Sequence, residues 1–447
     1  MRETALTPAS WREPSEVLAS LDDRPHSLGL LSGGSSGRWS YVCAEPDAWL
    51  SVGLDRAGEG VARLRDLLGP AAPGRADGPP FQGGVAGLCA YEMGAGRLAL
   101  DLARAEGWPD LAFGRYPALL AFDHQRRRVW AVGRGERAAA AQAQAERALA
   151  WLARPAPAPR TGALCPDLTS EPPQAYEAAV AEVVERIGRG EIFQANIARR
   201  WRGRLAPGAG PMDLLRRLLA QSPAPFAAYL RLEDRAVVSN SPERFVRVEP
   251  TAQGRLAQTQ PIKGTARRGR DAEEDRRLAE GLAASVKDRA ENLMIVDLMR
   301  NDLAQVCQAG GVAVPRLFEV ETFANVHHLV STVTGRLQPH RTALDLLEAA
   351  FPPGSITGAP KRQAMTVIAG LEPPRGPFFG AMVWAGFDGR MDSSVLIRTA
   401  ACVADADGWR VEARAGGGVV ADSDPMAERE ETEAKIAALA RALRETG

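Results

Sequence analysis

The hydrophobic and polar residues of this chain alternate with two different periods, which predicts a mixture of helices and strands. Apolar residues recur every three to four positions between Tyr176 and Gly190, a pattern typical of an amphipathic helix that ends at a glycine. Helical patterns cover residues 136–152, 176–190, 271–307, 342–350, 360–370 and 426–444, and strand patterns cover residues 83–94, 117–133, 191–205, 320–337, 381–405 and 409–422. We therefore expect an α+β protein in which helices pack on large, mostly antiparallel β-sheets.

A proline-rich segment divides the chain. Residues 154–173, RPAPAPRTGALCPDLTSEPP, alternate proline with small polar residues and read as an extended linker. We place the boundary there, between an N-terminal region at 1–153 and a catalytic domain at 174–447.

Composition narrows the class of protein. With 447 residues, 45% hydrophobic and 25% charged, the chain can bury one or two cores, as a globular enzyme does. Acidic and basic residues are equal at 55 each, so charge gives no reason to expect nucleic acid or an anionic membrane as partner. Five scattered cysteines without a CxxC pair suit reduced thiols, and no signal-like or membrane-spanning apolar stretch occurs. We expect a cytoplasmic protein.

Lysine is almost absent, because the 55 basic residues include only four lysines: 263, 287, 361 and 435. Arginine cannot lose its proton in a protein, whereas a desolvated lysine can. Lysines that persist in an arginine-rich chain therefore indicate chemistry, and all four lie in the C-terminal half. Chance retention on the surface remains open for each one.

Four carboxylates form two pairs at helical spacing. Asp288 with Glu291, and Glu428 with Glu431, lie three residues apart on two predicted helices, so each pair shares a helical face. Two such faces could hold a hard divalent cation, for which Mg²⁺ is the natural candidate. Two solvated acidic faces are the alternative.

Two further segments are candidates for binding anions. The run ARAGGGVVADSDP, residues 413–425, places three glycines between a predicted strand and a predicted helix, where exposed backbone N–H groups could bind an anion. A tight bend explains the glycines equally well. Arg398, on the predicted strand SSVLIRTA, is a second anion candidate, with a salt bridge at a sheet edge as the alternative.

Glu243 and Lys263 form a candidate acid and nucleophile. They lie in SNSPERF and QTQPIKGTARRG, two turn-rich segments on either side of a short predicted hairpin. A partly desolvated lysine can attack carbon, and the glutamate can exchange a proton with a leaving hydroxyl. A simple ion pair between them is the alternative.

Seven motifs occur in an order that resembles the chorismate-utilising enzymes over roughly residues 172–445. They are SPERF, PIKGT, DRAENLMIVDLMRNDL, FANVHHLVSTVTG, FPPGSITGAPK, SVLIRT and AGGGVVADSDP. In the N-terminal region, SGRWSYVCAEPD, GGVAGLCAYEMG and FDH resemble the family more loosely. The resemblance implies the fold of that family, with a β-sandwich-like core, and Mg²⁺-dependent binding of chorismate, a cyclohexadiene dicarboxylate.

Within the family, the resemblance favours the branch that makes 4-amino-4-deoxychorismate for p-aminobenzoate and folate. Members that add water use a lysine base where this chain has Gln194, and anthranilate synthases have alanine where it has Lys263. The resemblance implies that Lys263 attacks ring carbon 2 while Glu243 protonates the leaving 4-hydroxyl; ammonia then enters at carbon 4 and expels the lysine. An anthranilate synthase component, an enzyme of secondary metabolism and a non-catalytic chorismate-binding subunit remain alternatives.

The remaining site residues are assigned by their place in the motifs. The resemblance implies that Glu291 and Glu431 bind Mg²⁺ directly and that Glu428 and Asp288 reach it through water. The residues expected to contact substrate are Arg398, Gly417, Gly418, Lys435, Thr357, Gly264 and Thr265, with His328 as a further catalytic candidate in the ring pocket. Lys287 and Lys361 are expected to serve packing or helix-end electrostatics, and His327 to be a neighbour only.

The resemblance also implies a partner. No GxCxG nucleophile elbow of an amidotransferase occurs in the sequence, and in this family a separate glutaminase subunit supplies ammonia. The tryptophan-inhibition motif LLES of anthranilate synthases reads LLSGG at 30–34, so feedback by tryptophan is doubtful and structural binding of tryptophan stays open.

Overall fold

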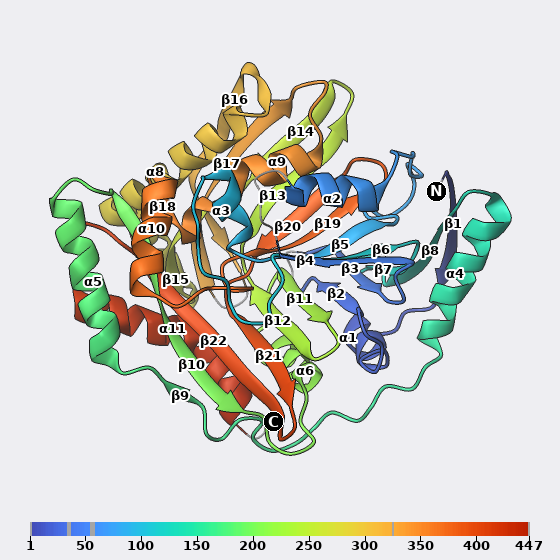
Figure 1. The fold of residues 1–447 in the computed structure, drawn as a ribbon, viewed down its shortest axis with the longest axis horizontal. Helices are drawn as coiled ribbons and strands as arrows, with labels where there is room; N and C mark the ends of the chain where they lie inside the picture. Colours follow the sequence, from blue (N-terminus) through green and yellow to red (C-terminus); the bar gives the residue numbers. More distant parts are fainter. Residues whose placement is uncertain (1, 34–36, 54–58, 324–325, 446–447) are drawn as a thin grey trace.

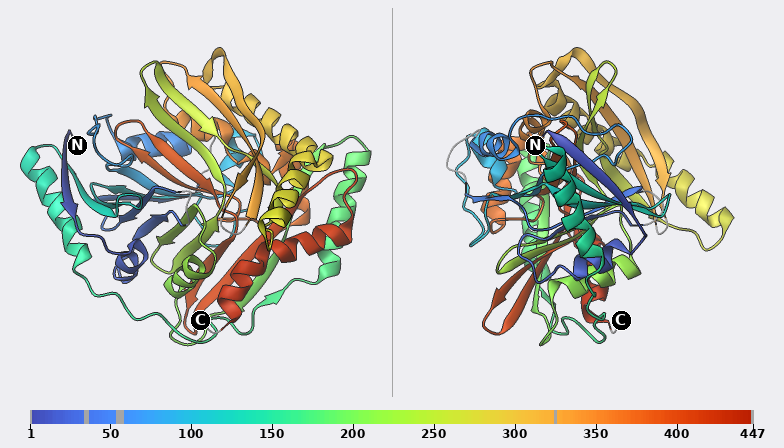
Figure 2. Two further views of the ribbon diagram at one scale, coloured as in Figure 1. Left: turned by 180° about the vertical axis from the view of Figure 1, so that it is seen from behind. Right: turned by 90° about the vertical axis from the view of Figure 1, so that its right-hand side faces the viewer.

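A computed structural model describes residues 2–33, 37–53, 59–323 and 326–445 of the chain. Two large β-sheets form the centre of the molecule, and helices lie around them (Figures 1 and 2). Every strand pair in the described residues is antiparallel, which confirms the predicted α+β class with large antiparallel sheets.

The first sheet has 12 strands within the described part of the chain. Its strand order is β1 (Glu3–Ala9), β8 (Arg128–Gly135), β7 (Ala118–Asp123), β3 (Trp39–Cys43), β2 (Leu28–Leu31), β11 (Phe226–Arg231), β12 (Arg235–Ser241), β21 (Thr399–Asp405), β22 (Gly408–Val419), β10 (Gln194–Arg204) and β18 (Gly358–Ala359), with β9 (Thr169–Ser170) paired to β10.

The second sheet has 10 strands, counted over the same residues. Its strand order is β15 (Ile262–Arg267), β17 (Val326–Leu337), β14 (Gly254–Thr259), β13 (Arg244–Thr251), β20 (Met391–Val395), β19 (Ala381–Gly386), β5 (Gly84–Cys89), β6 (Leu111–Tyr116) and β4 (Ala48–Val52), with β16 (Cys307–Thr322) paired to β17.

Apolar side chains from both sheets meet in one core. Leu28 and Leu230 of the first sheet pack with Leu88 and Met382 of the second, and all four are buried. Burying these facing surfaces holds the sheets together, as in a sandwich.

Helices cover the outer faces of the sheets. They are α1 (Pro14–Ala19), α2 (Glu59–Leu68), α3 (Met93–Arg97), α4 (Ala138–Leu152), α5 (Pro173–Gly188), α6 (Pro211–Gln221), α7 (Ala272–Ala284), α8 (Val286–Ala304), α9 (Ala343–Ala350), the 3₁₀ turn η1 (Gly354–Ile356), α10 (Lys361–Leu371) and α11 (Pro425–Arg444). Apolar residues of α4, α6 and α11 pack on the first sheet, and those of α8 and α9 pack on the second.

Three predicted elements differ from the structure. The helix predicted at 271–307 is two helices, because Ser285 leaves the helical conformation and its hydroxyl accepts a hydrogen bond from the Asp288 N–H (3.2 Å) as the cap of α8. The strand predicted at 320–337 is the end of β16 and all of β17; its residues 324–325 lie outside the described residues. The segment 381–405 forms three strands, β19, β20 and β21.

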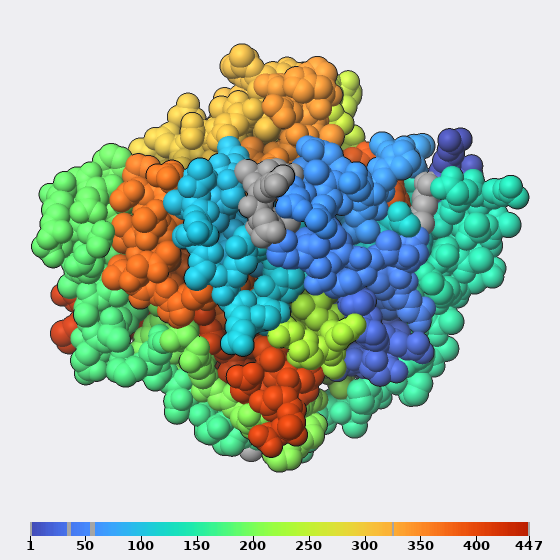
Figure 3. Space-filling model, viewed as in Figure 1, coloured from blue at the N-terminus to red at the C-terminus, as the bar shows by residue number. Residues whose placement is uncertain are grey.

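The proline-rich segment separates the chain in sequence but not in space. Residues 154–168 contain no helix or strand and run along the lower edge of the molecule from α4 to α5 (Figure 1). Strands from the two sides of the segment pair directly, β2 with β11 and β5 with β19. N-terminal residues accordingly lie against C-terminal ones on the surface in Figure 3. The predicted boundary therefore crosses both sheets.

Neither disulfide bonds nor membrane-spanning helices occur in the described residues. All five cysteines are free and buried. Among the described helices, none combines the length and apolar character needed to cross a bilayer.

The shared sheets predict that residues 174–447 do not fold alone. Without residues 1–153, strands β11 and β19 lose a paired neighbour, and the core between the sheets is opened. We expect this fragment to aggregate and the two fragments produced together to form a soluble complex, as measured by size-exclusion chromatography. A monomeric fragment 174–447 with cooperative urea unfolding would contradict the expectation.

Candidate active site

The predicted site residues gather where an edge of the second sheet meets the first sheet. Lys263 lies on β15, and its Nζ is 3.2 Å from Oε2 of Glu291 on α8. A Cβ placed on Gly418 of β22 would lie 2.8 Å from the same Nζ and would collide with the side-chain amide of Gln194 on β10. The site is thus built by both sheets together with α8 and α11.

The glycine run lies within the strand predicted at 409–422. Gly417 and Gly418 belong to β22, paired with Ile197 and Asn196 of β10, and do not form a tight bend after the strand. Their φ angles lie outside the left-handed region. The glycines instead make room, because a Cβ on Gly417 would lie 2.5 Å from Oε2 of Glu428, and one on Gly418 would strike Lys263.

Nearby lysines favour the ionised form of Glu431. Oε1 of Glu431 lies 2.5 Å from Nζ of Lys435, which also donates to the Gly416 carbonyl at 2.8 Å. Burial alone would raise the pKa of Glu431. The positive charges of Lys435, Lys263 and Lys287 have the larger effect, so the pKa of Glu431 is lowered. Burial in turn lowers the pKa of Lys435, against the attraction of Glu431.

Glu243 is the carboxyl group whose pKa burial raises to near neutrality. It lies between β12 and β13, where its N–H donates to the Ser241 hydroxyl (3.2 Å) and its carbonyl accepts from the Val395 N–H (3.1 Å). Burial raises its pKa from 4.5 to about 7, although a hydrogen bond from Ser355 and the charges of Lys263 and Lys435 act in the opposite direction. At neutral pH it can therefore donate a proton.

The remaining carboxylates offer oxygen atoms to a cation. Oε1 of Glu428 accepts a hydrogen bond from Ser423 (2.7 Å), whereas its buried Oε2 has no hydrogen-bond partner among the described residues. Burial raises the pKa of Glu428, and the charge of Glu431 raises it further.

Asp288 stands apart from the other three carboxylates. Within the described residues it makes no hydrogen bond or ion pair with them, and its Cγ would lie 2.9 Å from a Cβ on Gly264, next to Lys263. The described residues contain no ready-made cluster of three metal-binding side chains. The unpartnered oxygen of Glu428 and the hard oxygen donors nevertheless fit Mg²⁺, which keeps several waters and takes few protein ligands.

His328 and Arg398 form a second corner of the site. Nδ1 of His328, on β17, lies 2.9 Å from the Thr265 hydroxyl on β15. Burial, with the charge of Arg398, lowers the pKa of His328 to about 4, so the imidazole is neutral at pH 7.

Arg398 does not lie on a strand as predicted. It lies between β20 and β21 with φ +51°, a left-handed conformation that a bulky residue rarely adopts. Its guanidinium makes no hydrogen bond or ion pair with the described residues, and its charge influences His328, Glu431 and Lys435. Backbone strain that holds a charged group without a partner is typical of ligand-binding positions.

Two more buried polar residues face the site region. The Gln194 amide is fully buried, and neither its nitrogen nor its oxygen has a partner within the described part of the chain. Thr357 is also fully buried, but its hydroxyl donates to the Pro353 carbonyl (2.9 Å). A buried amide with two unmet hydrogen bonds is a strong candidate for contact with a ligand.

The other candidates lie outside this cluster or at its edge. Lys361 is buried in an ion pair with Asp302 (2.7 Å), and His327 lies 2.9 Å from an oxygen of Asp275. Lys287 is mostly exposed, with its Nζ 4.0 Å from Oε1 of Glu291. These contacts are structural, in keeping with the expectation for Lys361 and His327.

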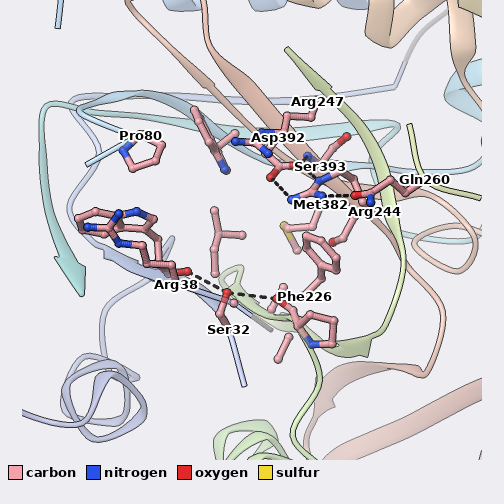
Figure 4. A pocket seen from close by; sticks show the side chains of 18 of the residues that line it. Ser32, Arg38, Pro80, Phe226, Arg244, Arg247, Gln260, Met382, Asp392 and Ser393 are labelled. Carbon is pink, nitrogen blue, oxygen red and sulfur yellow. Dashed lines mark hydrogen bonds and ion pairs between the residues drawn. The ribbon is translucent and has the colours of Figure 1, made fainter. Parts of the chain in front are cut away.

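A separate cavity of about 410 Å³ lies on the other side of the same chain segments. Pro242, Arg244 and Ile262 line the cavity. Glu243 and Lys263, their neighbours in sequence, do not line it, because successive side chains of an extended chain point to opposite sides. In Figure 4, Arg244 reaches Asp392 and Gln260 on one side, and Ser32 lies on the other. The cavity is therefore distinct from the cluster around Lys263.

Two site residues gave no separate signal in the sequence. Ser423 bonds Glu428 from only five positions earlier, yet a serine before a helix is common and points to no particular site. Ser355 acts on the pKa of Glu243 from 112 positions away in sequence, and no local pattern indicates this.

Comparisons with known proteins agree on one family. The profile of the chorismate binding enzymes matches residues 31–441. The chain is 43% identical to aminodeoxychorismate synthase component 1 of Klebsiella aerogenes over 365 residues, which are 80% of this chain and 76% of that protein. It is 39% identical to anthranilate synthase component 1 of Streptomyces coelicolor over 437 residues, covering 93% and 82%. The crystal structure of anthranilate synthase component I from Streptococcus pneumoniae superposes with a TM-score of 0.78 at 28% identity, covering 92% and 94%.

The close packing around β22 predicts that Gly418→Ala disables the site. The new methyl group would collide with Gln194 and Lys263, so we expect a loss of about 1–3 kcal/mol in the free energy of unfolding and at least a tenfold fall in kcat/KM for chorismate. Gly370→Ala in α10, where an added Cβ meets no atom within 4 Å, is the matched control and should gain about 0.5–1 kcal/mol. Equal behaviour of the two variants would contradict the packing argument.

The burial of Glu243 predicts a pH-dependent stability. Its pKa is about 7 in the folded protein against 4.5 for the free side chain, so the folded state holds the extra proton between these values and loses stability as pH rises through them. Relative to the wild type, Glu243→Gln should therefore gain up to about 3 kcal/mol between pH 4.5 and pH 8, measured by urea unfolding. The exposed Glu280→Gln is the control, and a constant difference for both variants would refute the assignment.

Proposed function

The chain belongs to the family of chorismate binding enzymes, and from that membership we propose that it converts chorismate and ammonia into 4-amino-4-deoxychorismate. The observation that carries the proposal is a lysine, Lys263, placed inside the charged cluster with the carboxyl of Glu243, whose pKa is raised to about 7, nearby. A nucleophile and a proton donor are the two groups that displacement of a ring hydroxyl requires.

The site suits a dianionic ring. Lys435, Arg398 and Lys263 supply positive charge from α11, from the turn before β21 and from β15, and Arg398 has no competing partner among the described residues. A carboxylate of chorismate would provide the countercharge that Arg398 lacks. The unmatched amide of Gln194 lies beside Lys263, where it can hydrogen-bond the ring substituents or the incoming ammonia.

The reaction is balanced by the chain's own groups. The ammonium of Lys263 first gives a proton to solvent. Its amine then forms a bond to ring carbon 2, both ring double bonds shift, and the bond from carbon 4 to oxygen breaks. Glu243 gives its proton to the departing oxygen, which leaves as water. Ammonia then bonds to carbon 4, the double bonds return, and Lys263 leaves carbon 2, so that one chorismate and one ammonia give one product and one water.

We assign Mg²⁺ to Glu291, Glu431 and Glu428, with Asp288 at longer range. Glu428 supports this assignment by its unpartnered oxygen, and Glu291 and Glu431 would exchange their lysine partners for the cation as substrate binds. When bound, Mg²⁺ would neutralise a substrate carboxylate. Isothermal titration with Mg²⁺ should show binding that Glu428→Gln weakens.

We further propose that a glutaminase subunit delivers the ammonia. The relatives named component 1 support a second component, and the protein would then serve p-aminobenzoate and folate synthesis in the cytoplasm. Anthranilate formation is the second candidate, because an anthranilate synthase component matches a larger share of the chain, 93%.

Product analysis separates the two candidates. With chorismate, Mg²⁺ and ammonium, the wild type should make 4-amino-4-deoxychorismate, and Lys263→Ala should lose at least about a thousandfold in kcat because the nucleophile is gone. Intact-protein mass spectrometry should find the wild type carrying one chorismate less one water. Lys263→Arg, which keeps the positive charge without the nucleophile, is the matched control and should be equally inactive.

Two results would overturn this assignment. One is anthranilate as the main product of the wild type. The other is an Lys263→Arg variant that retains most activity, since that would make the lysine a charge rather than a nucleophile.

A further inference from the structure

We propose that Arg375 and Glu372 are positioning residues for the active site: their buried ion pair holds the open edge of β10 at the point where Gln194 enters the site. This inference rests on the proposed function. The two residues lie in the segment between α10 and β19, and Nη2 of Arg375 is 2.9 Å from Oε1 of Glu372. Their side chains are only 1% and 4% exposed, so water cannot take the place of either partner.

One edge of β10 lacks a neighbouring strand over part of its length. On one side, β10 pairs with β22 over residues 195–204. On the other side, it pairs with β18 at residues 194–195 and with β9 at residues 201–202, and no described strand lies beside the residues in between. Every second residue of a strand turns its N–H and C=O groups to a given side, and such groups need partners when they are buried.

The ion pair takes the place of the missing strand. Nη2 of Arg375 donates to the Asn196 carbonyl (2.6 Å), and Oε1 of Glu372 accepts from the Ala198 N–H (2.7 Å). The guanidinium and the carboxylate thus supply the donor and the acceptor that a neighbouring strand would supply. Hydrogen bonds to charged groups are stronger than those between neutral groups, so this edge is held firmly.

The same guanidinium also ties β10 to the turn η1. Nη1 of Arg375 donates to the Ile356 carbonyl (2.9 Å), and the Asn196 N–H donates to the carbonyl of the next residue, Thr357 (2.8 Å). Because the guanidinium is planar and rigid, the two carbonyls bonded to it keep a fixed separation. Arg375 therefore sets the distance between the strand that carries Gln194 and the turn that leads to Thr357.

The N-terminal region holds the arginine in place. Oε1 of Glu92 accepts from the Arg375 N–H (2.6 Å), and Oε2 accepts from the Gly376 N–H (2.9 Å). The guanidinium also lies over the rings of Tyr91 and Phe379, 4.7 Å and 4.6 Å from their centroids. Arg375 cannot withdraw from β10 without losing these contacts.

Gln194 depends on this arrangement because its own side chain is not held. Neither atom of its buried amide has a hydrogen-bond partner among the described residues, so its main chain decides where the amide lies. The fit is close: a Cβ on Gly418, the residue paired with Asn196, would lie 2.1 Å from Nε2 of Gln194 and 2.8 Å from Nζ of Lys263. A displacement of about 1 Å at such a site can cost about a hundredfold in rate.

Hydrogen–deuterium exchange of the ligand-free protein tests the edge of β10 directly. In Arg375→Met, peptides that cover residues 194–200 should exchange at least about tenfold faster than in the wild type, because local opening of this edge becomes easier. Peptides from β11 and β12 should exchange as before. The rate of chorismate consumption at saturating chorismate, Mg²⁺ and ammonium should fall about 10- to 100-fold, with KM for chorismate changed less than about threefold.

Arg217→Met is the matched control. Arg217 on α6 is also a buried arginine, and it donates to four main-chain carbonyls away from β10, those of Arg160, Gly162, Ala442 and Glu445. Its loss should lower the free energy of unfolding but leave both the exchange at 194–200 and the saturated rate unchanged.

A double variant separates positioning from stability. Arg375→Met together with Glu372→Met leaves no unpaired charge in the interior, so it should unfold at higher urea than Arg375→Met alone. The edge of β10 stays open, so fast exchange at 194–200 and the low rate should persist. If Arg375→Met does not fold, the double variant provides the same comparison with the wild type.

A double variant with the wild-type rate, or equally fast exchange at 194–200 in Arg217→Met, would overturn the proposal. Failure of the proposed function is recognised separately, by the product that the wild type forms. The exchange is measured without substrate, and the rate of chorismate consumption does not depend on which product is made.

Discussion

The chemistry of this protein depends on burying several charges of both signs in one small volume. A buried charge is costly unless an opposite charge or a hydrogen bond accompanies it. Lys435 and the other nearby lysines keep Glu431 ionised, whereas Glu243, with weaker compensation, keeps a proton up to a pH of about 7, which is where its pKa lies. One site thus contains carboxylates suited to a cation and a carboxyl suited to proton donation, and the difference arises from their neighbours rather than from the residue type.

The fold supplies the rigid frame that this balance needs. Lys263 comes from an edge of one sheet, while Gln194 and Gly418 come from the other sheet, so their separation is set by how the two sheets pack. The N-terminal strands complete both sheets and support that packing without contributing any of the predicted catalytic side chains. Glycine at 417 and 418 then lets charged side chains approach a strand that any larger residue would hold away.

The sequence was sufficient for features that depend on local pattern. Periodicity located helices such as α5 and α11, and carboxylates three residues apart do share helical faces. It was insufficient where distant segments decide the outcome: the strand predicted at 409–422 is β22, but local pattern does not identify its partner β10, more than 200 residues earlier. Arg398 read as a strand residue because its left-handed φ is imposed by the turn between β20 and β21. The buried amide of Gln194, which has no hydrogen-bond partner among the described residues, is a property of the packed chain that no spacing rule contains.

If Lys263 is the nucleophile we propose, its position would explain how one fold can support different products. Its Nζ lies 3.2 Å from Oε2 of Glu291, a residue that we assign to the Mg²⁺ site, and it lies next to Gly418. By the family resemblance, anthranilate synthases carry alanine at this position; truncation there would remove the nucleophile and leave Glu291, Gly418 and Glu243 where they are. Binding of the ring and protonation of its hydroxyl could then continue, while the bond to carbon 2 would have to come from ammonia itself. Under the proposed mechanism, a single side chain at the junction of the sheets would redirect nitrogen from carbon 2 to carbon 4 without a change in the scaffold.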